Sequence, residues 1–155
     1  MVNLDTLEKV EVFKDLDDRR LSSVSECCTE MAFQRGEGIF KAGEEARHLW
    51  AVAEGRVKLD AEPASTLQAN EVSEREVFGW PSLVRPHTYR FSASCATRST
   101  RVIRIDSRCL QGLFEKDPEL GYRVMFRLLR VMGDRFHQLQ EEVVKRRGHD
   151  MMHQW

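Results

Sequence analysis

The sequence has little that would place the protein in a membrane or draw it to nucleic acid. None of its apolar runs approaches the length that a bilayer crossing needs, and residues 1–10 carry Asp5 and Glu8 where a signal peptide is basic and then apolar. The 155 residues hold 24 Lys and Arg against 25 Asp and Glu, a formal net charge of −1. This balance gives no overall electrostatic attraction to DNA or anionic lipid. We therefore expect a cytoplasmic protein with no membrane contact.

Cysteine is scarce, and its spacing favours neither metal nor disulfide chemistry. The four cysteines are Cys27, Cys28, Cys95 and Cys109. They lack the paired spacing of a metal site and the density of a disulfide scaffold. Cys27 and Cys28 are expected on one helix, with one thiol buried and the other partly exposed. The sequence thus predicts structural thiols, with redox sensing as the less favoured alternative.

Histidine patterns of known catalytic and metal sites are also absent. The five histidines form no His-x-His pair with a following carboxylate, as a cupin metal site would require, and no nucleophile and base can be paired from sequence order. A haem sensor with His87 or Cys95 as axial ligand remains an alternative, supported only by the presence of those residues. We expect no enzymatic activity, no metal and no cofactor.

What the chain does contain fits one domain with one core. Its residues are 41% hydrophobic and 32% charged, as in an ordinary globular protein. Leu4 to Val12 has apolar residues at helical spacing, and Asp17 or Asp18 is placed to cap a second helix that runs to about Cys28. We expect a single domain over 1–155, made of N-terminal helices (1–28), a β-roll (29–106), C-terminal helices (107–147) and a tail (148–155).

The middle of the chain changes to short apolar runs separated by glycine and charged residues. Such spacing favours an antiparallel barrel or jelly roll. Residues 62–75 are the least patterned part, and we expect a hairpin with a mobile tip there. The expected strands are Met31 to Phe33, Ile39 to Phe40, Leu49 to Val52, Val57 to Leu59, Phe91 to Ala96, and Val102 to Ile105. The predicted fold is α+β, a roll flanked by helices.

One stretch, residues 76–94, has the features of an anion site. Gly79 allows a sharp backbone bend, and Pro81 suits the first position of a short helical turn. Backbone N–H groups of Ser82 and Leu83 would then have no partner within the turn and would attract a phosphate. Arg90, on the strand that follows, would bring a guanidinium with two donors to the same anion.

These residues resemble the phosphate-binding cassette of the cyclic nucleotide-binding domain family, the sensor half of the catabolite activator. Phe78, Gly79 and Arg90 match the family pattern, and the glycine turns Gly36-Glu37, Gly43-Glu44 and Glu54-Gly55-Arg56-Val57 match as well. Trp80 stands where the family has the Glu that binds the ribose hydroxyl. Phe91 stands where a small hydroxyl residue is usual, and Arg75 where a turn glycine is common. The resemblance implies a β-roll with a cyclic-nucleotide pocket, here degenerate at two ligand positions.

The two substitutions decide what the pocket is expected to bind. Loss of the ribose carboxylate would weaken a nucleotide by about tenfold to a hundredfold. The indole of Trp80 would fill the sugar pocket, or else offer a ring and one N–H donor to another ligand; we favour the filling. Arg90 has an equal alternative as a strand arginine that faces solvent or pairs with Glu76.

The C-terminal part predicts two helices and an interface. Asp106 or Ser107 begins a helix through Phe114, and Asp117, Pro118 and Glu119 form a strong start signal for the next. Along that helix one apolar stripe is available for the roll, at Leu120, Val124, Leu128 and Val131. A second stripe repeats at steps of three and four and predicts a homodimer, in which two copies pair along a seam. The seam is Tyr122, Met125, Leu129, Met132, Phe136, Leu139 and Val143.

The function expected from these features is regulatory. After Val144 the chain has too few residues for a helix-turn-helix, so direct DNA binding is not expected, and Gly148 is expected to end the helix. We predict a dimeric sensor module that signals through an unidentified partner protein and binds a small anionic or nucleotide ligand weakly or not at all. The alternatives are a functional cyclic AMP or cyclic GMP receptor and a β-roll metal or haem protein.

Overall fold

The computed structural model describes residues 2–61 and 70–153. Helices α1 (Leu4–Glu8) and α2 (Asp18–Ser25), with the 3-10 turn η1 (Glu11–Phe13) between them, precede the strands. Helices α3 (Ser107–Lys116) and α4 (Pro118–His153) follow the strands. The strands are β1 (Cys28–Gln34), β2 (Gly38–Phe40), β3 (His48–Glu54), β4 (Val57–Ala61), β5 (Asn70–Val72), β6 (Val77–Phe78), β7 (Phe91–Cys95) and β8 (Ser99–Asp106).

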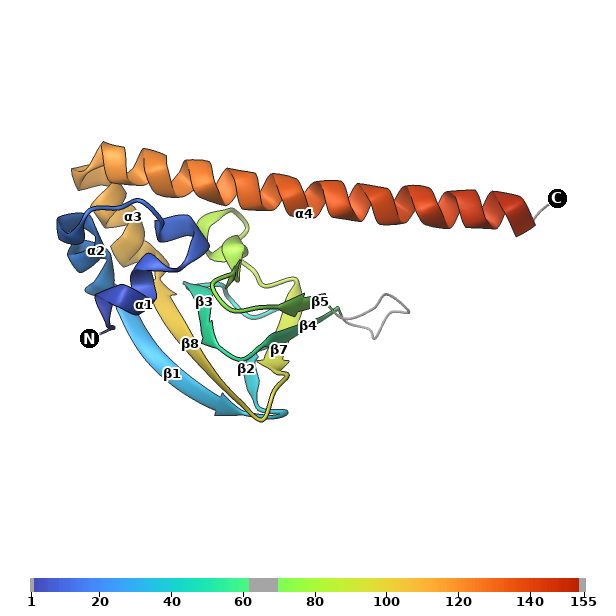
Figure 1. The fold of residues 1–155 in the computed structure, drawn as a ribbon, viewed down its shortest axis with the longest axis horizontal. Helices are drawn as coiled ribbons and strands as arrows, with labels where there is room; N and C mark the ends of the chain where they lie inside the picture. The colour runs from blue at the N-terminus through green and yellow to red at the C-terminus, as the bar shows by residue number, and fades with distance from the viewer. Residues whose placement is uncertain (1, 62–69, 154–155) are drawn as a thin grey trace.

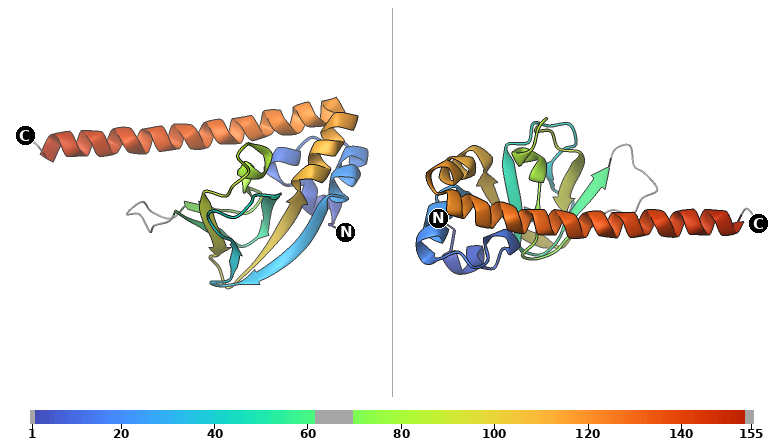
Figure 2. Two further views of the ribbon diagram at one scale, coloured as in Figure 1. Left: turned by 180° about the vertical axis from the view of Figure 1, so that it is seen from behind. Right: turned by 90° about the horizontal axis from the view of Figure 1, so that it is seen from above.

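The strands form two antiparallel sheets that face each other as a roll. One sheet has the order β1-β8-β3-β6 and the other the order β2-β7-β4-β5. The helices gather on one side of the roll, and α4 runs across it and projects beyond it (Figure 1). Seen from above, α4 crosses the roll and extends well beyond the strands (Figure 2). The predicted α+β fold, a β-roll with N-terminal helices and a long C-terminal helix, is confirmed.

The first sheet separates two apolar cores because successive side chains of a strand point to opposite faces. Leu49 and Ala51 of β3 belong to a cluster with the helices, here called the helix-side core. Trp50 and Val52 of the same strand belong to a cluster inside the roll, here called the roll core. The same alternation places Val77 of β6 in the helix-side core and Phe78 in the roll core.

The N-terminal helices differ from the prediction in their ends. The expected helix from Leu4 to Val12 is split, because Val10 adopts an extended conformation between α1 and η1. The split lets both Val10 and Phe13 become buried. The second helix has its predicted cap, since the Asp17 carboxylate accepts the N–H of Arg20 at 2.8 Å. It ends at Ser25, however, so Cys28 opens β1 instead of closing a helix.

The predicted strands are all present. The hairpin expected between 62 and 75 is confirmed at its base, where β4 pairs with β5 from Val57 with Val72 to Leu59 with Asn70. Its tip lies outside the described residues. Arg75, at the position of a family turn glycine, has φ 75°, and its N–H donates to the carbonyl of Val52 at 2.8 Å. The turn thus keeps the conformation that a glycine favours.

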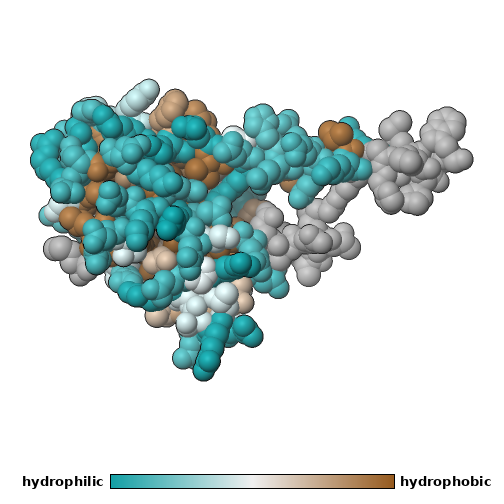
Figure 3. Space-filling model, in the orientation of Figure 1, coloured by the Kyte–Doolittle hydropathy of each residue, from teal (hydrophilic) through white to brown (hydrophobic). Residues whose placement is uncertain are grey.

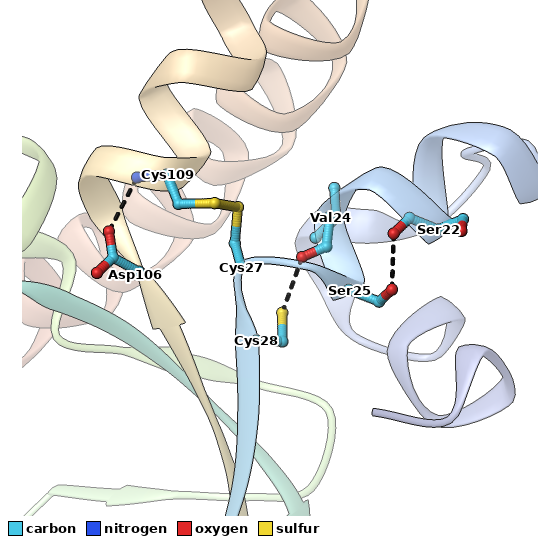
Figure 4. Close-up of a disulfide and its surroundings, with 7 residues drawn as sticks. All are labelled: Ser22, Val24, Ser25, Cys27, Cys28, Asp106 and Cys109. Atoms are coloured by element: carbon cyan, nitrogen blue, oxygen red, sulfur yellow. Dashed lines mark hydrogen bonds between the residues drawn. A yellow bond between two sulfur atoms is a disulfide. The ribbon is translucent and has the colours of Figure 1, made fainter. Parts of the chain in front are cut away.

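The cysteine prediction was wrong for two of the four residues. Cys27 and Cys109 form a disulfide with a Cα separation of 5.5 Å, and 82 positions separate them in the sequence (Figure 4). Chain-entropy loss in the unfolded state makes a cross-link over such a loop worth about 4 kcal/mol. Sequence spacing held no sign of it, because the pair comes together only when β1 and β8 lie side by side. Cys28 and Cys95 are free and buried.

The C-terminal helices begin as predicted and end later. The Asp106 carboxylate caps α3 by accepting the N–H of Cys109, and Asp117 caps α4 by accepting the N–H of Leu120. The expectation that Gly148 ends the last helix was wrong, because α4 continues to His153. Gly148 and the residues before it remain in one helix, where a glycine costs about 1 kcal/mol relative to alanine without breaking the hydrogen-bond ladder.

Candidate functional site

The cassette has the predicted backbone. Strand β6 ends at Phe78, Gly79 adopts the left-handed conformation with φ 77° and ψ 26°, and the 3-10 turn η2 (Trp80–Leu83) follows. A side chain disfavours this conformation, so Gly79 is required by the bend. Pro81 lies within the first turn of η2, as expected from its fixed φ.

One of the two backbone donors predicted to bind an anion, that of Ser82, is already satisfied within the turn. The N–H of Ser82 donates to the carbonyl of Gly79 at 3.2 Å, so the expectation that it would be free for an anion was wrong. The N–H of Val84 donates to the carbonyl of Pro81 at 3.2 Å. Leu83 packs against the helix-side core. The Ser82 hydroxyl is buried and has no hydrogen-bond partner among the described residues.

Two aromatic side chains occupy the space beside Gly79. A methyl group at Gly79 would lie 2.8 Å from Cδ1 of Trp50 and 3.3 Å from Cε1 of Tyr89. The Tyr89 hydroxyl donates to the carbonyl of His48 at 2.8 Å, and Nε1 of Trp50 donates to that hydroxyl at 3.1 Å. Burial raises the pKa of Tyr89, which keeps this hydroxyl protonated. The hydrogen bonds hold both rings against the cassette.

These rings continue into a stack that fills the roll. Phe40 lies on Tyr89 with ring centroids 3.7 Å apart. Phe78 lies 6.0 Å from Phe40 and 6.0 Å from Trp50. All four side chains are buried. Sequence reasoning did not identify this stack; its only signal was one large aromatic residue in or beside each of four short extended segments.

Trp80 lies outside this stack. Its side chain is partly buried against the helix-side core, on the side of α4. The prediction was that its indole fills the sugar pocket, but the structure packs Trp80 against the helix-side core. The aromatic side chains inside the roll are Phe40, Trp50, Phe78 and Tyr89. Trp80 does leave the ribose position of the cassette without a carboxylate.

Arg90 and Phe91 both lie at the surface. Phe91 opens β7 with 42% of its surface exposed. The guanidinium of Arg90 is exposed, and within the described ranges it has no hydrogen bond or ion pair. Of the two alternatives for Arg90, facing solvent fits the structure, whereas the carboxylate of Glu76 accepts from the N–H of Ser73 instead. The structure therefore does not bring Arg90 onto the η2 donors as a closed cradle.

A polar contact joins the cassette strand to α4. The Arg135 guanidinium donates to the carbonyl of Val77 at 2.7 Å, and the Glu11 carboxylate accepts the N–H of the same residue at 3.2 Å. Arg135 and Glu11 lie 3.8 Å apart. Burial raises the pKa of Glu11, against the opposing effects of the Val77 N–H and Arg135. Residues from η1, β6 and α4 thus meet two positions before Gly79.

Other features of the described chain do not suggest a second site for a metal. Residues 2–61 and 70–153 hold no group of three His, Cys, Asp or Glu side chains close enough to share an ion. One hollow of about 200 Å³ lies beside α1, and another of about 300 Å³ lies between Lys14 and α4; neither is lined by cassette residues. In the same ranges, no helix has the length and apolar character required to cross a bilayer.

Comparison with known families matches the cyclic nucleotide-binding domain over residues 30–117, which is more than half of the chain and includes the whole cassette. The chain belongs to this family. The match confirms the resemblance carried by Phe78, Gly79 and Arg90. It begins within β1 and ends at residue 117, just before α4, so α4 lies entirely beyond it.

Solved structures and curated relatives agree with the family and the fold. A Geobacter metallireducens protein described as cyclic nucleotide-binding is 27% identical with a TM-score of 0.76, covering 88% of this chain and all 100% of that one. A cyclic nucleotide-binding domain from Methylobacillus flagellatus is 19% identical with a TM-score of 0.77, covering 92% and 81%. Mouse patatin-like phospholipase domain-containing protein 7 is 32% identical over 124 residues, covering 68% of this chain and 9% of that protein. The chain spans less than a third of the curated relatives it matches.

The predicted seam on α4 is mostly uncovered in the single chain. Apolar surface is visible on α4 both over the domain and near its projecting end (Figure 3). Met132 differs from the other seam residues, since it is partly buried against the helix-side core. The exposed seam residues are Tyr122 (69%), Met125 (41%), Leu129 (68%), Phe136 (59%), Leu139 (53%) and Val143 (44%). In contrast, Leu120, Val124 and Leu128 of the other stripe are buried, as predicted, whereas its fourth member, Val131, is only half-buried.

Replacement of Gly79 tests the packing beside the cassette. Gly79→Ala should lower the free energy of unfolding by about 1–2 kcal/mol from backbone strain and by about 1–3 kcal/mol more from overlap with Trp50. Gly36→Ala is the matched control, because Gly36 has φ 85° but no atom near the added methyl group. Chemical denaturation measures both. Equal losses at the two positions would show that the ring does not fill the space beside Gly79.

Replacement of Glu11 tests the contact between the cassette strand and α4. Because burial raises the folded-state pKa of Glu11 above 4.5, the protonated form favours folding, and this contribution is lost as pH rises through the folded-state value. Glu11→Gln stays neutral and can still accept from Val77. Its unfolding free energy, relative to the parent, should therefore rise with pH across that window. Denaturation at a series of pH values measures this, and the same rise in the exposed control Glu8→Gln would contradict it.

Proposed function

We propose that this chain is a dimeric regulatory module of the cyclic nucleotide-binding type, in which cyclic-nucleotide binding is weakened or lost. It pairs through the seam of α4 and signals through a partner protein. The main support for weakened binding is the position of Trp50 and Tyr89. Their rings lie against Gly79 and occupy the side of the cassette that faces the roll. We also propose that the domain is cytoplasmic and does not bind DNA directly.

The state of the cassette supports weak binding in three ways. Trp80 cannot supply the carboxylate that holds a ribose hydroxyl in the family. The N–H of Ser82 already has a partner in Gly79, so it is not a free donor for phosphate. Admitting a nucleotide to the roll would require Tyr89 and Trp50 to give up a mutual hydrogen bond and their burial, at a cost of about 2–5 kcal/mol.

The shape of α4 supports pairing. The helix has 36 residues and is therefore about 54 Å long, longer than the domain it crosses. Its inner stripe is buried by its own domain, and its outer stripe exposes large apolar side chains over several turns. Monomeric proteins rarely expose a continuous apolar surface of this kind. A second copy, placed by a two-fold axis, would cover the same stripe on both chains.

The contact of Arg135 with Val77 supports a route between cassette and interface. A change in the cassette strand would alter the hydrogen bond to Arg135, and Arg135 lies one residue before seam residue Phe136. The same helix would then carry the change to the partner copy. The unidentified partner protein would respond to the altered arrangement of the two α4 helices.

The alternative is a functional cyclic AMP or cyclic GMP receptor. Three observations favour it: Gly79 keeps the left-handed bend, the Ser82 hydroxyl is buried without a partner in the described part of the chain, and Arg90 is unpaired there. In this alternative, ligand binding turns the side chain of Arg90 into the roll and that of Tyr89 out of it. A metal or haem function, the further alternative, has no comparable support among the described side chains.

Titration calorimetry with cyclic AMP and cyclic GMP separates the two functions. We expect the affinity of this chain for either nucleotide to be about tenfold to a hundredfold lower than that of a family member that has the ribose-binding Glu. The reason is the missing charge-assisted hydrogen bond to the ribose. Trp80→Glu alone should not restore tight binding, because Trp50 and Tyr89 still occupy the roll. Tight, saturable binding by the parent protein that Arg90→Ala abolishes would establish the receptor instead.

A charge in the seam tests the dimer. Leu139→Glu would place a carboxylate in the apolar interface and should raise the dimer dissociation constant by at least about tenfold. Leu139 is preferable to Met132 for this test, because Met132 also packs on its own domain. Gln138→Glu is the control, since Gln138 is exposed and lies outside the seam. Sedimentation velocity measures the result; a parent protein that sediments as a monomer would overturn the dimer.

A further inference from the structure

We propose that the Cys27–Cys109 disulfide is a reversible thiol exchange site. A low-molecular-weight thiol opens it at the sulfur of Cys109, and the corresponding small disulfide closes it. Opening releases the end of α2 and the first turn of α3 from each other. This inference concerns a different region from the cassette and stands whether or not the protein binds a nucleotide.

Access to the two sulfurs is unequal. Cys109 is exposed on the first turn of α3, whereas Cys27, between α2 and β1, is only 7% exposed. Figure 4 shows the bond reaching from the α3 helix to the start of β1. A thiolate must touch the sulfur that it attacks, so exposure directs the attack to Cys109.

The exchange balances with two molecules of thiol. The first, as thiolate, bonds to the sulfur of Cys109 and breaks the bond to Cys27, whose sulfur leaves as a thiolate and takes a proton. The second attacks the small-molecule sulfur of the mixed disulfide and releases Cys109. The protein disulfide is thereby reduced to two thiols, and two small thiols are oxidised to one disulfide. The reverse sequence restores the bond.

The adjacent free thiol does not compete. Cys28 is buried, and its Sγ donates to the carbonyl of Val24 at 3.2 Å. Burial raises the pKa of Cys28 to about 12, so very little thiolate is present near neutral pH. Since only the thiolate attacks a disulfide, Cys28 does not shuffle the bond to its neighbour. The exchange therefore stays between Cys27, Cys109 and the small thiol.

The disulfide is accompanied by other contacts between the region of α2 and the C-terminal helices. At the other end of α2, Arg20 pairs with Asp117 at 2.9 Å and with Glu119 at 2.7 Å. The backbone N–H of Asp106 also donates to the carbonyl of Cys27 at 2.9 Å. These contacts remain when the disulfide opens, so reduction should loosen the junction locally without unfolding the domain. The loosened α3 packs against the base of α4.

The test is reduction of the folded protein. The native chain is treated with reduced glutathione, transferred to thiol-free buffer near neutral pH, alkylated with iodoacetamide while folded and mapped by mass spectrometry. We expect alkylation of Cys109 after reduction and not before it, no alkylation of the buried Cys28 or Cys95, and restoration of the bond by oxidised glutathione. Hydrogen exchange at 18–27 and 107–111 should become several-fold faster after reduction. The Cys27→Ser and Cys109→Ser double variant should show this faster exchange with or without thiol, and Cys28→Ala should behave as the parent.

Single variants test the direction of attack. Cys27→Ser leaves the exposed Cys109 and should take up glutathione from oxidised glutathione, whereas Cys109→Ser leaves the buried Cys27 and should not. The inference is overturned if the bond is reduced only after denaturation, if it does not form under oxidised glutathione, or if both single variants are modified alike. Unchanged hydrogen exchange on reduction would overturn the loosening of α2 and α3.

Discussion

The structure depends first on burial of the inner stripe of α4. Leu120, Val124 and Leu128 pack into the helix-side core together with η1, α2 and the outer face of the first sheet. Each such side chain contributes about 1.5–3 kcal/mol by leaving water, which fixes the helix on the domain. Because a helix has 3.6 residues per turn, the stripe that includes Leu129 and Phe136 must then face elsewhere. The same burial therefore holds α4 in place and creates the exposed seam.

The alternation of β3 and β6 has an equally large effect on the cassette. Val77, which meets Glu11 and Arg135, is followed directly by Phe78, which joins the aromatic stack. The residue after Phe78 is Gly79, which touches Trp50. The helix-side contacts and the aromatic packing inside the roll thus meet at three consecutive residues. A filled roll stabilises one arrangement of β6, and any ligand would have to displace rings to change it.

The sequence was most informative where local chemistry decides structure. The caps at Asp17, Asp106 and Asp117 and the bend at Gly79 were predictable because each depends on neighbouring residues only. The two stripes of α4 were predictable from periodicity, although Met132 proved to be shared between the seam and the core. The end of α4 was not predictable, because a single glycine such as Gly148 weakens a long helix without having to end it.

The features that escaped prediction are non-local. Cys27 and Cys109 meet only through strand pairing, which no spacing rule encodes. The cassette prediction turned Arg90 inward because an anion site would need it, yet Tyr89 takes the inward position. In an extended segment two neighbours cannot both point inward, and burying a phenol with a hydrogen bond costs far less than burying an unpaired guanidinium. The pattern of the motif was sound, but the choice between adjacent side chains depended on Trp50 and His48.

The contacts at α4 also explain why a domain with a filled roll can still be regulated. Several groups contact this helix, among them the ion pairs of Arg20 at its start, the α3 junction that the disulfide closes, and the contact of Arg135 with the cassette strand. Of these, only the last involves the cassette. The proposed opening of the disulfide at Cys109 would act on the base of α4 through α3 and would require no displacement of Tyr89 or Trp50. In the proposed dimer the seam lies on this same helix, so an input at its base and an input at the cassette would both change the relative placement of the two α4 helices.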